Sequence, residues 1–438
     1  MDFAGALVAV TGLVALAMVV WHVRTWPALG WILVGLGAVL NSDAAPKALF
    51  AIGGTNIFAE DAVVGVLLLA ALSRKIGIRT GFGGKLFLPA TTCFLLLFSL
   101  VLGYAVYGIP AIVEFRPFLY FVGTLVWATS LDWSSVTTEL HVRRFFYVCG
   151  WGITVVALIN LAKNGIASSS DMYIDSDGTY RTLRPLVASQ AALLAVAGVF
   201  VLHDWGRQRG GLRLASGAVF IVVAIIAQHR SVWTALAAGV LILAISSDLR
   251  VKRRLSIVSV VGAYLVVMLA ISGVLDGVFQ SLMNSVDAIT ANKSTLEDRT
   301  SGWESLVADS LNSGPAAVLF GQPFGTGYLR IGPTGQVQTY APHNWFVSIY
   351  LRSGLLGLSA ILVVLAGAWK RLFGMRSVWA GLILCLVVFA MAYSVQWFLA
   401  ALIGGAIAMS NTVVRRTESD ATSNAVTVAS DGERAALL

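Results

Sequence analysis

The sequence has few charged residues for its length. Of 438 residues only 12% are Asp, Glu, Lys or Arg, whereas soluble globular chains carry about 25%. Hydrophobic residues make up 58%, and the mean hydropathy is +0.82. The apolar residues fall in blocks of about 16 to 25, the length that crosses a ~30 Å hydrocarbon core as a helix. The composition therefore excludes an ordinary soluble domain and predicts an all-α polytopic membrane protein.

The sequence also has few cysteines and lacks the common nucleotide-binding motif. The three cysteines, Cys93, Cys149 and Cys385, all fall inside apolar blocks, which favours core positions over disulfides or a metal site. No GxxxxGK[ST] motif is present, and the basic connections are too short for a nucleotide-binding domain, which argues against ATP-driven pumping. We expect any chemistry on the outer face, without a metal or other cofactor.

The apolar blocks predict thirteen spanning segments. The second could be re-entrant and the last two could form one bent helix, so a total of twelve spans is also plausible. The segments are 4–21, 27–41, 59–73, 86–108, 117–131, 145–162, 185–203, 214–229, 231–247, 255–274, 344–367, 377–394 and 395–412.

The distribution of Lys and Arg predicts the orientation. Nineteen of them fall on one side of the predicted spans and ten on the other, so the first side is expected to be cytoplasmic. This asymmetry accounts for the net charge of +8 without a nucleic-acid partner. We expect one transmembrane catalytic domain over 1–412, with external loops at 163–184 and 275–343. Residues 413–438 are predicted to be a disordered cytoplasmic tail.

The larger loop contains a helical pattern. "STLEDRTSGWESLVADSLN" opens with a capping-box pair, Ser294 and Glu297, and apolar residues follow at roughly helical spacing. They are Leu296, Trp303, Leu306, Val307 and Leu311. We expect an amphipathic helix on the membrane surface, followed by the glycine-rich turn "FGQPFGTGY".

Three ionisable residues stand at one predicted depth on the outer face: Arg230, Arg299 and His343. Each has a plain structural reading, because interfacial arginines often extend to the headgroups and a histidine at a helix end often has only a structural role. Together they suggest chemistry. Two guanidinium groups can hold a diphosphate, and an imidazole can take a proton from an attacking hydroxyl. This combination predicts displacement of a lipid-linked diphosphate by a hydroxyl.

Four motifs in order resemble the O-antigen ligase and O-antigen polymerase superfamily. They are "YRTLRPLVASQAALLA", "HRSVWTALAAGV", "EDRTSGW" and "HNWFVSIYLRSGLLGL", which together cover roughly 180–360. The resemblance implies a fold related to GT-C glycosyltransferases and inverting transfer of a glycan from polyprenyl diphosphate to an acceptor on the periplasmic face of the inner membrane.

The resemblance also implies roles for individual residues. Arg230 and Arg299 would bind the donor diphosphate, with Arg181 or Arg184 as a further contact, and His343 would be the base. Asn344, Trp303 and Trp345 are candidate acceptor or sugar contacts. Position 352 is often acidic in that family but is Arg352 here, which suggests a different acceptor or a local pairing with a carboxylate. Gly354 and Gly357 are expected at helix-packing positions.

Two acidic pairs offer rival sites. Asp175 and Asp177 spell the DxD of metal-dependent glycosyltransferases, although Asp-Ser-Asp-Gly is also ordinary turn composition, which we favour. Glu60 and Asp61 resemble the acidic pair in the first external loop of other GT-C enzymes, but they also fit a helix N-terminus, which we favour.

The function classes that compete are therefore a glycosyltransferase and a flippase or transporter of lipid-linked glycans. Transporters tend to contain internal repeats and broken helices at the midplane, and no repeat is present in this chain. The enzyme is favoured, most of all an O-antigen ligase, with a polymerase as its alternative. The expected partners are the donor lipid, a lipid or glycan acceptor and membrane lipids.

Overall fold

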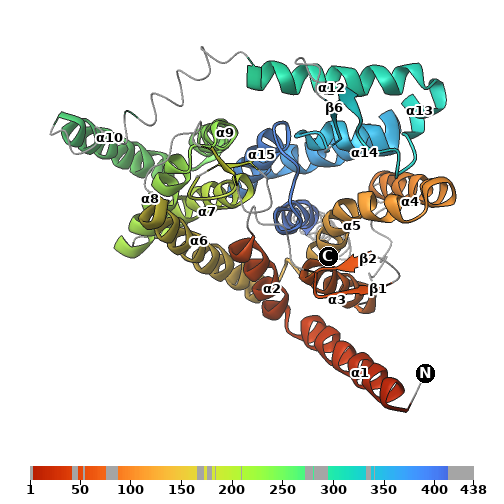
Figure 1. The fold of residues 1–438 in the computed structure, drawn as a ribbon. Coiled ribbons are helices and arrows are strands. Elements are labelled where there is room, and N and C mark those ends of the chain that lie inside the picture. The colour runs from red at the N-terminus through yellow and green to blue at the C-terminus, as the bar shows by residue number, and fades with distance from the viewer. Residues whose placement is uncertain are drawn as a thin grey trace, which may run out of the picture.

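The computed structural model shows a mostly helical chain (Figure 1). The residues that it describes are 3–41, 48–52, 55–74, 87–164, 172–174, 180–182, 184–208, 210–271, 280, 294–331, 337–339 and 341–412.

Each of the thirteen predicted segments corresponds to a helix. In chain order these are α1 (Phe3–Thr25), α2 (Pro27–Leu40), α3 (Ala59–Ser73), α4 (Phe87–Tyr107), α5 (Ile109–Thr129), α6 (Val136–Asn164), α7 (Ala188–Arg207), α8 (Gly211–Ile226), α9 (Arg230–Ser246), α10 (Leu249–Ile271), α14 (Trp345–Gly374), α15 (Val378–Ala390) and the last helix, Trp397–Thr412. The start of α5 lies eight residues before the predicted 117, because the polar Glu114 and Arg116 on its first turns masked the helical pattern.

Several of these helices could cross a membrane. Among the described residues, α5, α6, α7 and α14 are long and apolar enough, and the bent pair Val14–Thr25 and Pro27–Leu40 makes a fifth if counted as one span. The pair is bent by 107°. The 17 residues of α9 extend only about 26 Å, less than a ~30 Å core, and α8, α15 and the last helix are similarly short. The structure is thus consistent with a multi-pass membrane protein.

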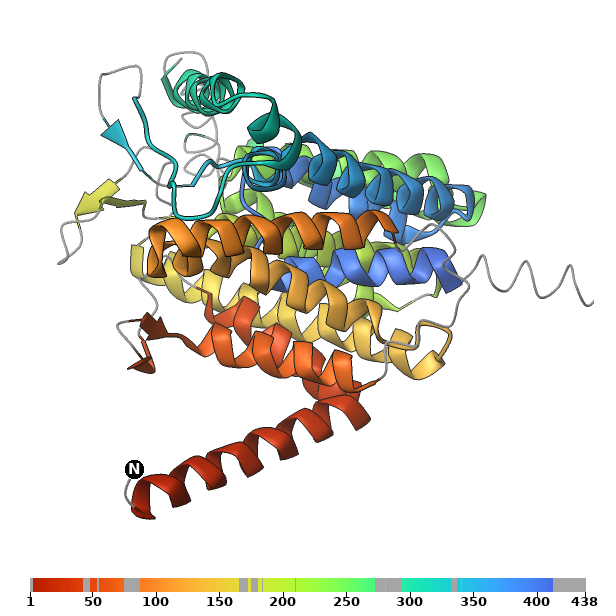
Figure 2. The ribbon, with the colours of Figure 1, turned by 90° about the vertical axis from the view of Figure 1, so that its right-hand side faces the viewer.

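Three short antiparallel hairpins lie at one end of the helical bundle. They are β1 (Phe50–Ile52) with β2 (Thr55–Ile57), β3 (Met172–Ile174) with β4 (Tyr180–Thr182), and β5 (Arg330–Ile331) with β6 (Val337–Gln338). Figure 2 shows all three at the same end, opposite the end of the last helix. The described hairpins of the loops at 163–184 and 275–343 thus lie at the same end of the bundle.

The hydrophobic core surrounds α7, which contacts α6, α8, α9, α10 and α15. Indole rings fill much of the core beside it: Trp31, Trp127, Trp133 and Trp379 are each 6% exposed or less. Trp31 meets Trp127 edge-on at 5.2 Å between ring centroids. Cys149 and Cys385 are buried and Cys93 is half-buried, all as free thiols, as predicted.

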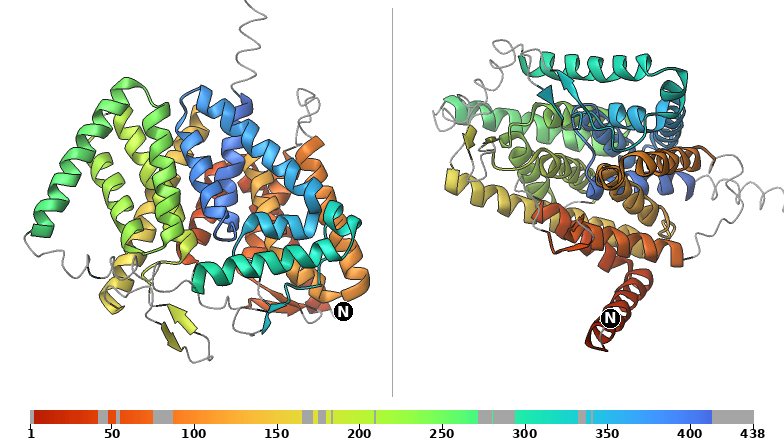
Figure 3. Two further views of the ribbon diagram at one scale, coloured as in Figure 1. Left: turned by 90° about the horizontal axis from the view of Figure 1, so that it is seen from above. Right: turned by 45° about the vertical axis from the view of Figure 1, so that its right-hand side comes forward.

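The helix predicted in the large loop is present as α12 (Ser294–Asn312), which lies across the bundle near α14 (Figures 1 and 3). Its buried face is formed by Gly302, Leu306 and Ser310, at intervals of four residues. Leu306 packs with Tyr350 and neighbouring residues of α14. Leu311 is 56% exposed and lies outside this buried face.

α14 is interrupted by a kink at Gly354. The backbone there has φ 63° and ψ −170°, a conformation that favours glycine. A Cβ at this position would meet the carbonyl carbon of Leu319, near the end of α13 (Pro315–Phe320), at 2.2 Å. Gly354 is therefore required by a left-handed turn as well as by close packing, and it packs on a loop helix rather than on another span.

Candidate functional site

Tyr393 lies at the centre of the candidate site, between α15 and the last helix. The Arg299 guanidinium carbon is 5.2 Å from the centroid of its ring. The imidazole of His343 lies 5.9 Å from the same ring, and that of His229 lies 6.2 Å from it, between centroids. Four segments far apart in the sequence therefore meet around one tyrosine.

Arg299 reaches this cluster from α12. It is half-buried, and its Nη1 donates a long hydrogen bond of 3.5 Å to the carbonyl oxygen of Ala392. Its guanidinium over the Tyr393 ring makes a cation–π contact. Trp303, one helical turn further along α12, is also half-buried. The packing of α12 on α14 thus holds Arg299 beside the segment that follows α15.

The turn between α8 and α9 supplies His229 and Arg230. Gln228, just before them, is buried and has φ 57°, a left-handed conformation that non-glycine residues seldom adopt. Such strained residues persist where the surrounding structure fixes them, and they are frequent at functional sites. Here the turn places His229 at the N-cap of α9 and Arg230 at its first residue, half-buried.

His229 connects Arg184 to the cluster. The Arg184 Nη1 donates to His229 Nδ1 at 2.9 Å, so Nδ1 is the accepting nitrogen. The other ring nitrogen, Nε2, lies 2.8 Å from the carbonyl oxygen of Leu186 and must carry the proton. Burial of this ring, followed by the charge of Arg184, lowers the pKa of His229 to about 3. His229 is therefore a neutral side chain that orients Arg184.

Arg184 is the further arginine that the described side chains bring to the cluster. Arg181 lies in β4, opposite Tyr173 of β3, and its side chain is outside the described residues. Arg184 contacts His229. The pKa of Arg230 is lowered first by burial and then by charge repulsion from Arg184. Its Nε is buried and makes no hydrogen bond within the described part of the chain.

His343 lies just before α14 with its side chain exposed. The protein around its ring still desolvates the imidazolium, and the guanidinium groups of Arg299 and Arg330 add repulsion, which lowers the pKa of His343 to about 4. Arg330 itself is only 6% exposed and packs against Gly302 of α12. The ring of His343 is therefore neutral at pH 7, with a nitrogen lone pair that can accept a proton.

Asn344 and Trp345 take structural positions, unlike the predicted sugar contacts. The Asn344 Oδ1 accepts from the backbone N–H groups of Phe346 at 3.0 Å and Val347 at 3.2 Å, which caps α14. Trp345 is 6% exposed, and its ring packs 4.6 Å from that of Phe121. The Oδ1 of Asn344 is thus occupied as a helix cap and the Trp345 ring is part of the core, positions that a structural role explains.

The cluster carries positive charge without a described counterion. Among the described side chains, no carboxylate lies within ion-pair distance of Arg184, Arg230 or Arg299, whereas the structure pairs other arginines such as Arg116 and Arg143. Like charges held together are costly unless an anion joins them. The arrangement is suited to binding a group with several negative charges next to a neutral imidazole.

Arg352 has a carboxylate partner, Glu114 of α5. Its Nε donates to Glu114 Oε1 at 2.5 Å, its Nη2 also contacts that oxygen, and Nη2 donates to the Gly327 carbonyl oxygen at 2.7 Å. The other carboxylate oxygen of Glu114 accepts from the backbone N–H groups of Gly325 and Gly327 at 2.7 and 3.2 Å. Of the two readings of Arg352 from the sequence, the structure therefore shows pairing with a nearby carboxylate. The pair also holds the backbone of the glycine-rich turn in place.

The acidic pair Glu60–Asp61 begins α3, and Asp61 is fully engaged. It accepts from the Phe58 backbone N–H at 2.8 Å and the Tyr120 hydroxyl at 2.7 Å, and it pairs with Arg116 at 3.3 Å. This favours the helix N-terminus over an acidic site. Asp175 and Asp177 lie outside the described residues.

The sequence did not predict three residues of the cluster: Tyr393, His229 and Arg330. His229 adjoins Arg230 in the same short motif, so its position could have indicated it. Tyr393 carries no such signal, because it lies in an apolar block and only the break after α15 turns it toward the arginines.

Comparison with known proteins adds no relative. The chain matches no family model, no curated protein and no solved structure. Its class as a helical protein with several helices that could span a membrane thus rests on its own sequence and structure.

Proposed function

We propose that this protein is a membrane glycosyltransferase that moves a glycan from a polyprenyl diphosphate carrier to an acceptor hydroxyl. The observation that carries the proposal is the cluster of Arg184, Arg230 and Arg299 around Tyr393, beside the neutral imidazole of His343. A diphosphate supplies the negative charge that the described side chains do not bring to this cluster, and the imidazole supplies a proton acceptor.

In this proposal the arginines hold the diphosphate and stabilise the charge that develops as it leaves. The acceptor oxygen attacks the anomeric carbon from the face opposite the diphosphate, and its proton passes to His343. The new C–O bond forms as the bond to the diphosphate oxygen breaks, so the anomeric carbon is inverted. No metal is needed to neutralise the leaving group, because the guanidinium groups carry the positive charge.

Donor binding would also prepare the base. With no donor, repulsion from Arg299 and Arg330 and desolvation hold the pKa of His343 at about 4, which makes it a weak base. An anion on the arginines cancels part of that repulsion and raises the pKa toward the working pH. His343 thus becomes a better proton acceptor only when the donor is in place, so the acceptor hydroxyl is not deprotonated before the donor binds.

The same proposal includes the finer features expected from the sequence. They are twelve or thirteen spans, a GT-C-like architecture, an inner-membrane location and an active site on the outer face with the hairpins. Ligase activity toward a finished lipid anchor is preferred, and polymerase activity toward a second lipid-linked repeat is the alternative within the class. A flippase is the second class, supported by the interfacial arginines alone.

The decisive experiment incubates the purified protein with a polyprenyl diphosphate glycan and candidate acceptors, with and without EDTA. We expect transfer in both conditions, and the product identifies the acceptor. Loss of transfer in EDTA would favour a metal bound at Asp175 and Asp177. Movement of the donor lipid across vesicles without any transfer would establish the flippase instead.

A further inference from the structure

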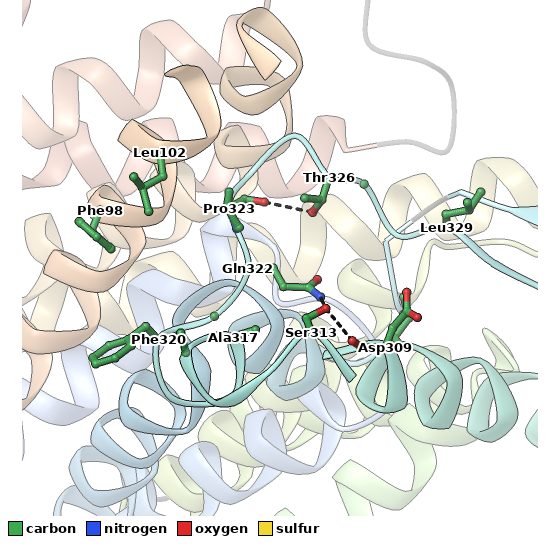
Figure 4. Close-up of a pocket in the computed structure, with 14 residues that line it drawn as sticks. Phe98, Leu102, Asp309, Ser313, Ala317, Phe320, Gln322, Pro323, Thr326 and Leu329 are labelled. Carbon is green, nitrogen blue, oxygen red and sulfur yellow. Dashed lines mark hydrogen bonds between the residues drawn. The ribbon is translucent and has the colours of Figure 1, made fainter. Parts of the chain in front are cut away.

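A cavity of about 470 Å³ lies between α4, α12, α13 and the glycine-rich turn (Figure 4). None of the residues of the Tyr393 cluster lines it. Its volume falls within the ~300–1,000 Å³ of small-molecule sites. The cavity is therefore a second candidate site, at the opposite end of α12 from Arg299.

One wall of the cavity is apolar and partly open to the surroundings. Phe98 and Leu102 of α4 and Phe320 of α13 form it, and these side chains are 45%, 42% and 43% exposed. The outer surface of α4 continues this apolar face with Phe94 and Val101, which are 65% and 66% exposed. If α4 borders the lipid, as its composition suggests, this wall faces the membrane.

The other wall offers hydrogen-bond acceptors. Gln322 donates through Nε2 to the Ser313 Oγ at 3.2 Å, and that hydroxyl donates to the Asp309 backbone carbonyl at 2.8 Å (Figure 4). The Gln322 Oε1 and the Asp309 carboxylate have no hydrogen-bond or ion-pair partner within the described part of the chain. Both are planar groups that accept from hydroxyls. Apolar rings beside such acceptors are suited to a sugar, whose hydroxyls donate and whose C–H faces pack on rings.

We propose that this cavity binds the glycan of the membrane-anchored acceptor, an inference that rests on the proposed transfer reaction. The donor diphosphate belongs at the arginines, so the sugar attached to it lies at His343. The acceptor needs its own approach, and the cavity has a wall toward the membrane for the anchor and a polar wall for sugars.

The spacing between the two sites suits one acceptor molecule. Along α12, Arg299 and Asp309 are ten residues apart, or about 15 Å. Along α14, eight residues separate His343 from Leu351, whose carbonyl oxygen accepts from the Gln322 backbone N–H at 2.7 Å, or about 12 Å. The two helices thus give similar separations, of about 12 and 15 Å. An acceptor of a few sugars reaches His343 with its terminal hydroxyl while its earlier sugars occupy the cavity.

The test measures glycan binding without any donor. The full chain in lipid nanodiscs is applied to an array of bacterial-type oligosaccharides that includes hexoses, heptoses, deoxyhexoses and amino sugars. We compare the wild type with the double variant Asp309→Asn/Gln322→Ala. Glu304→Gln is the matched control, since Glu304 is an exposed acidic residue of α12 that does not line the cavity.

We expect the wild type and Glu304→Gln to bind a subset of glycans. The double variant should bind them about 10- to 30-fold more weakly, because the Gln322 acceptor is lost and the Asp309 acceptor loses its charge. In transfer assays the double variant should raise the acceptor KM and leave the donor KM unchanged. Binding of no glycan, or equal binding by the wild type and the double variant, would overturn the inference. Glycan binding that depends on these residues but leads to no transfer from any donor would refute the glycosyltransferase and leave the sugar site standing.

Discussion

Arg352 of α14 and Glu114 of α5 form an ion pair in which Arg352 is fully buried and the Glu114 side chain is 13% exposed. The pair also binds the backbone of the glycine-rich turn on both sides, through Gly325 and Gly327. The Arg352 guanidinium lies over the rings of Tyr328 at 4.6 Å and Phe324 at 5.7 Å. One ion pair therefore joins two long helices to the turn that lines the cavity.

Removal of Glu114 should destabilise the protein more than removal of Arg352. Glu114→Ala leaves a buried guanidinium without its anion, which costs about 3–5 kcal/mol. Arg352→Met fills similar space without a charge, and the remaining Glu114 carboxylate keeps two backbone donors, so we expect a smaller loss. Thermal unfolding in nanodiscs measures both variants.

A matched control for this comparison is the exposed pair Arg376–Asp248, whose side chains are 66% and 64% exposed. Asp248→Asn should change stability by no more than about 1 kcal/mol. Equal unfolding temperatures for Glu114→Ala and Asp248→Asn would show that the buried pair contributes little.

The kink in α14 should depend on glycine. Gly354→Ala forces a side chain into a left-handed conformation and against the backbone of Leu319, which should cost more than the ~1–2 kcal/mol of the conformation alone. Gly367→Ala, in the same helix, places its Cβ where nothing lies within 4 Å and should be neutral or stabilising. Unfolding of the two variants under one condition provides the measurement, and equal stability would argue against the kink.

The pH dependence of transfer should show two different acidic limbs. In the proposed reaction the neutral form of His343 is the active one, so we expect activity to fall as the pH drops through its pKa. For kcat/KM, which reports the free enzyme, we expect this limb near pH 4. For kcat, which reports the donor complex, the limb should lie at higher pH, because the bound anion raises the pKa. His343→Ala should abolish transfer at every pH and retain donor binding; in the wild type a kcat/KM limb near the ordinary ~6.5 would contradict the lowered pKa.

Exchange of arginine for lysine tests the proposed diphosphate site. Arg230→Lys and Arg299→Lys keep the positive charge but lose the planar fork of donors, so we expect a loss of activity of about tenfold or more in each. Arg250→Lys is the control, because Arg250 is exposed on α10 and lies away from the cluster in sequence and contacts. Activity retained in both cluster variants would mean that charge alone is sufficient there.

Tyr393 should act through its ring. Tyr393→Phe keeps the aromatic face under Arg299, whereas Tyr393→Leu removes a cation–π contact of about 0.5–2 kcal/mol. We therefore expect the donor KM to rise about 2- to 30-fold in Tyr393→Leu and to change little in Tyr393→Phe. If both variants are equally impaired, the hydroxyl rather than the ring is the important group.

The sequence by itself determined which segments are helical, because a run of apolar residues with few charges can satisfy its backbone in a membrane only as a helix. It also indicated Arg230, Arg299, His343 and the loop helix α12, since charge in or beside apolar segments is costly and therefore conspicuous. Patterns of this kind can be read from residues that are neighbours in the sequence.

Only the tertiary structure decided how distant segments meet. The partner of Arg352 is 238 positions away in the chain, and Tyr393 turns toward the arginines because a helix breaks there. The kink at Gly354 likewise depends on the packing of α13, and Trp345 and Asn344 proved to be a core residue and a helix cap. Contacts between residues far apart depend on the packing of whole helices, which no local pattern specifies. This packing brought the scattered charges into one cluster.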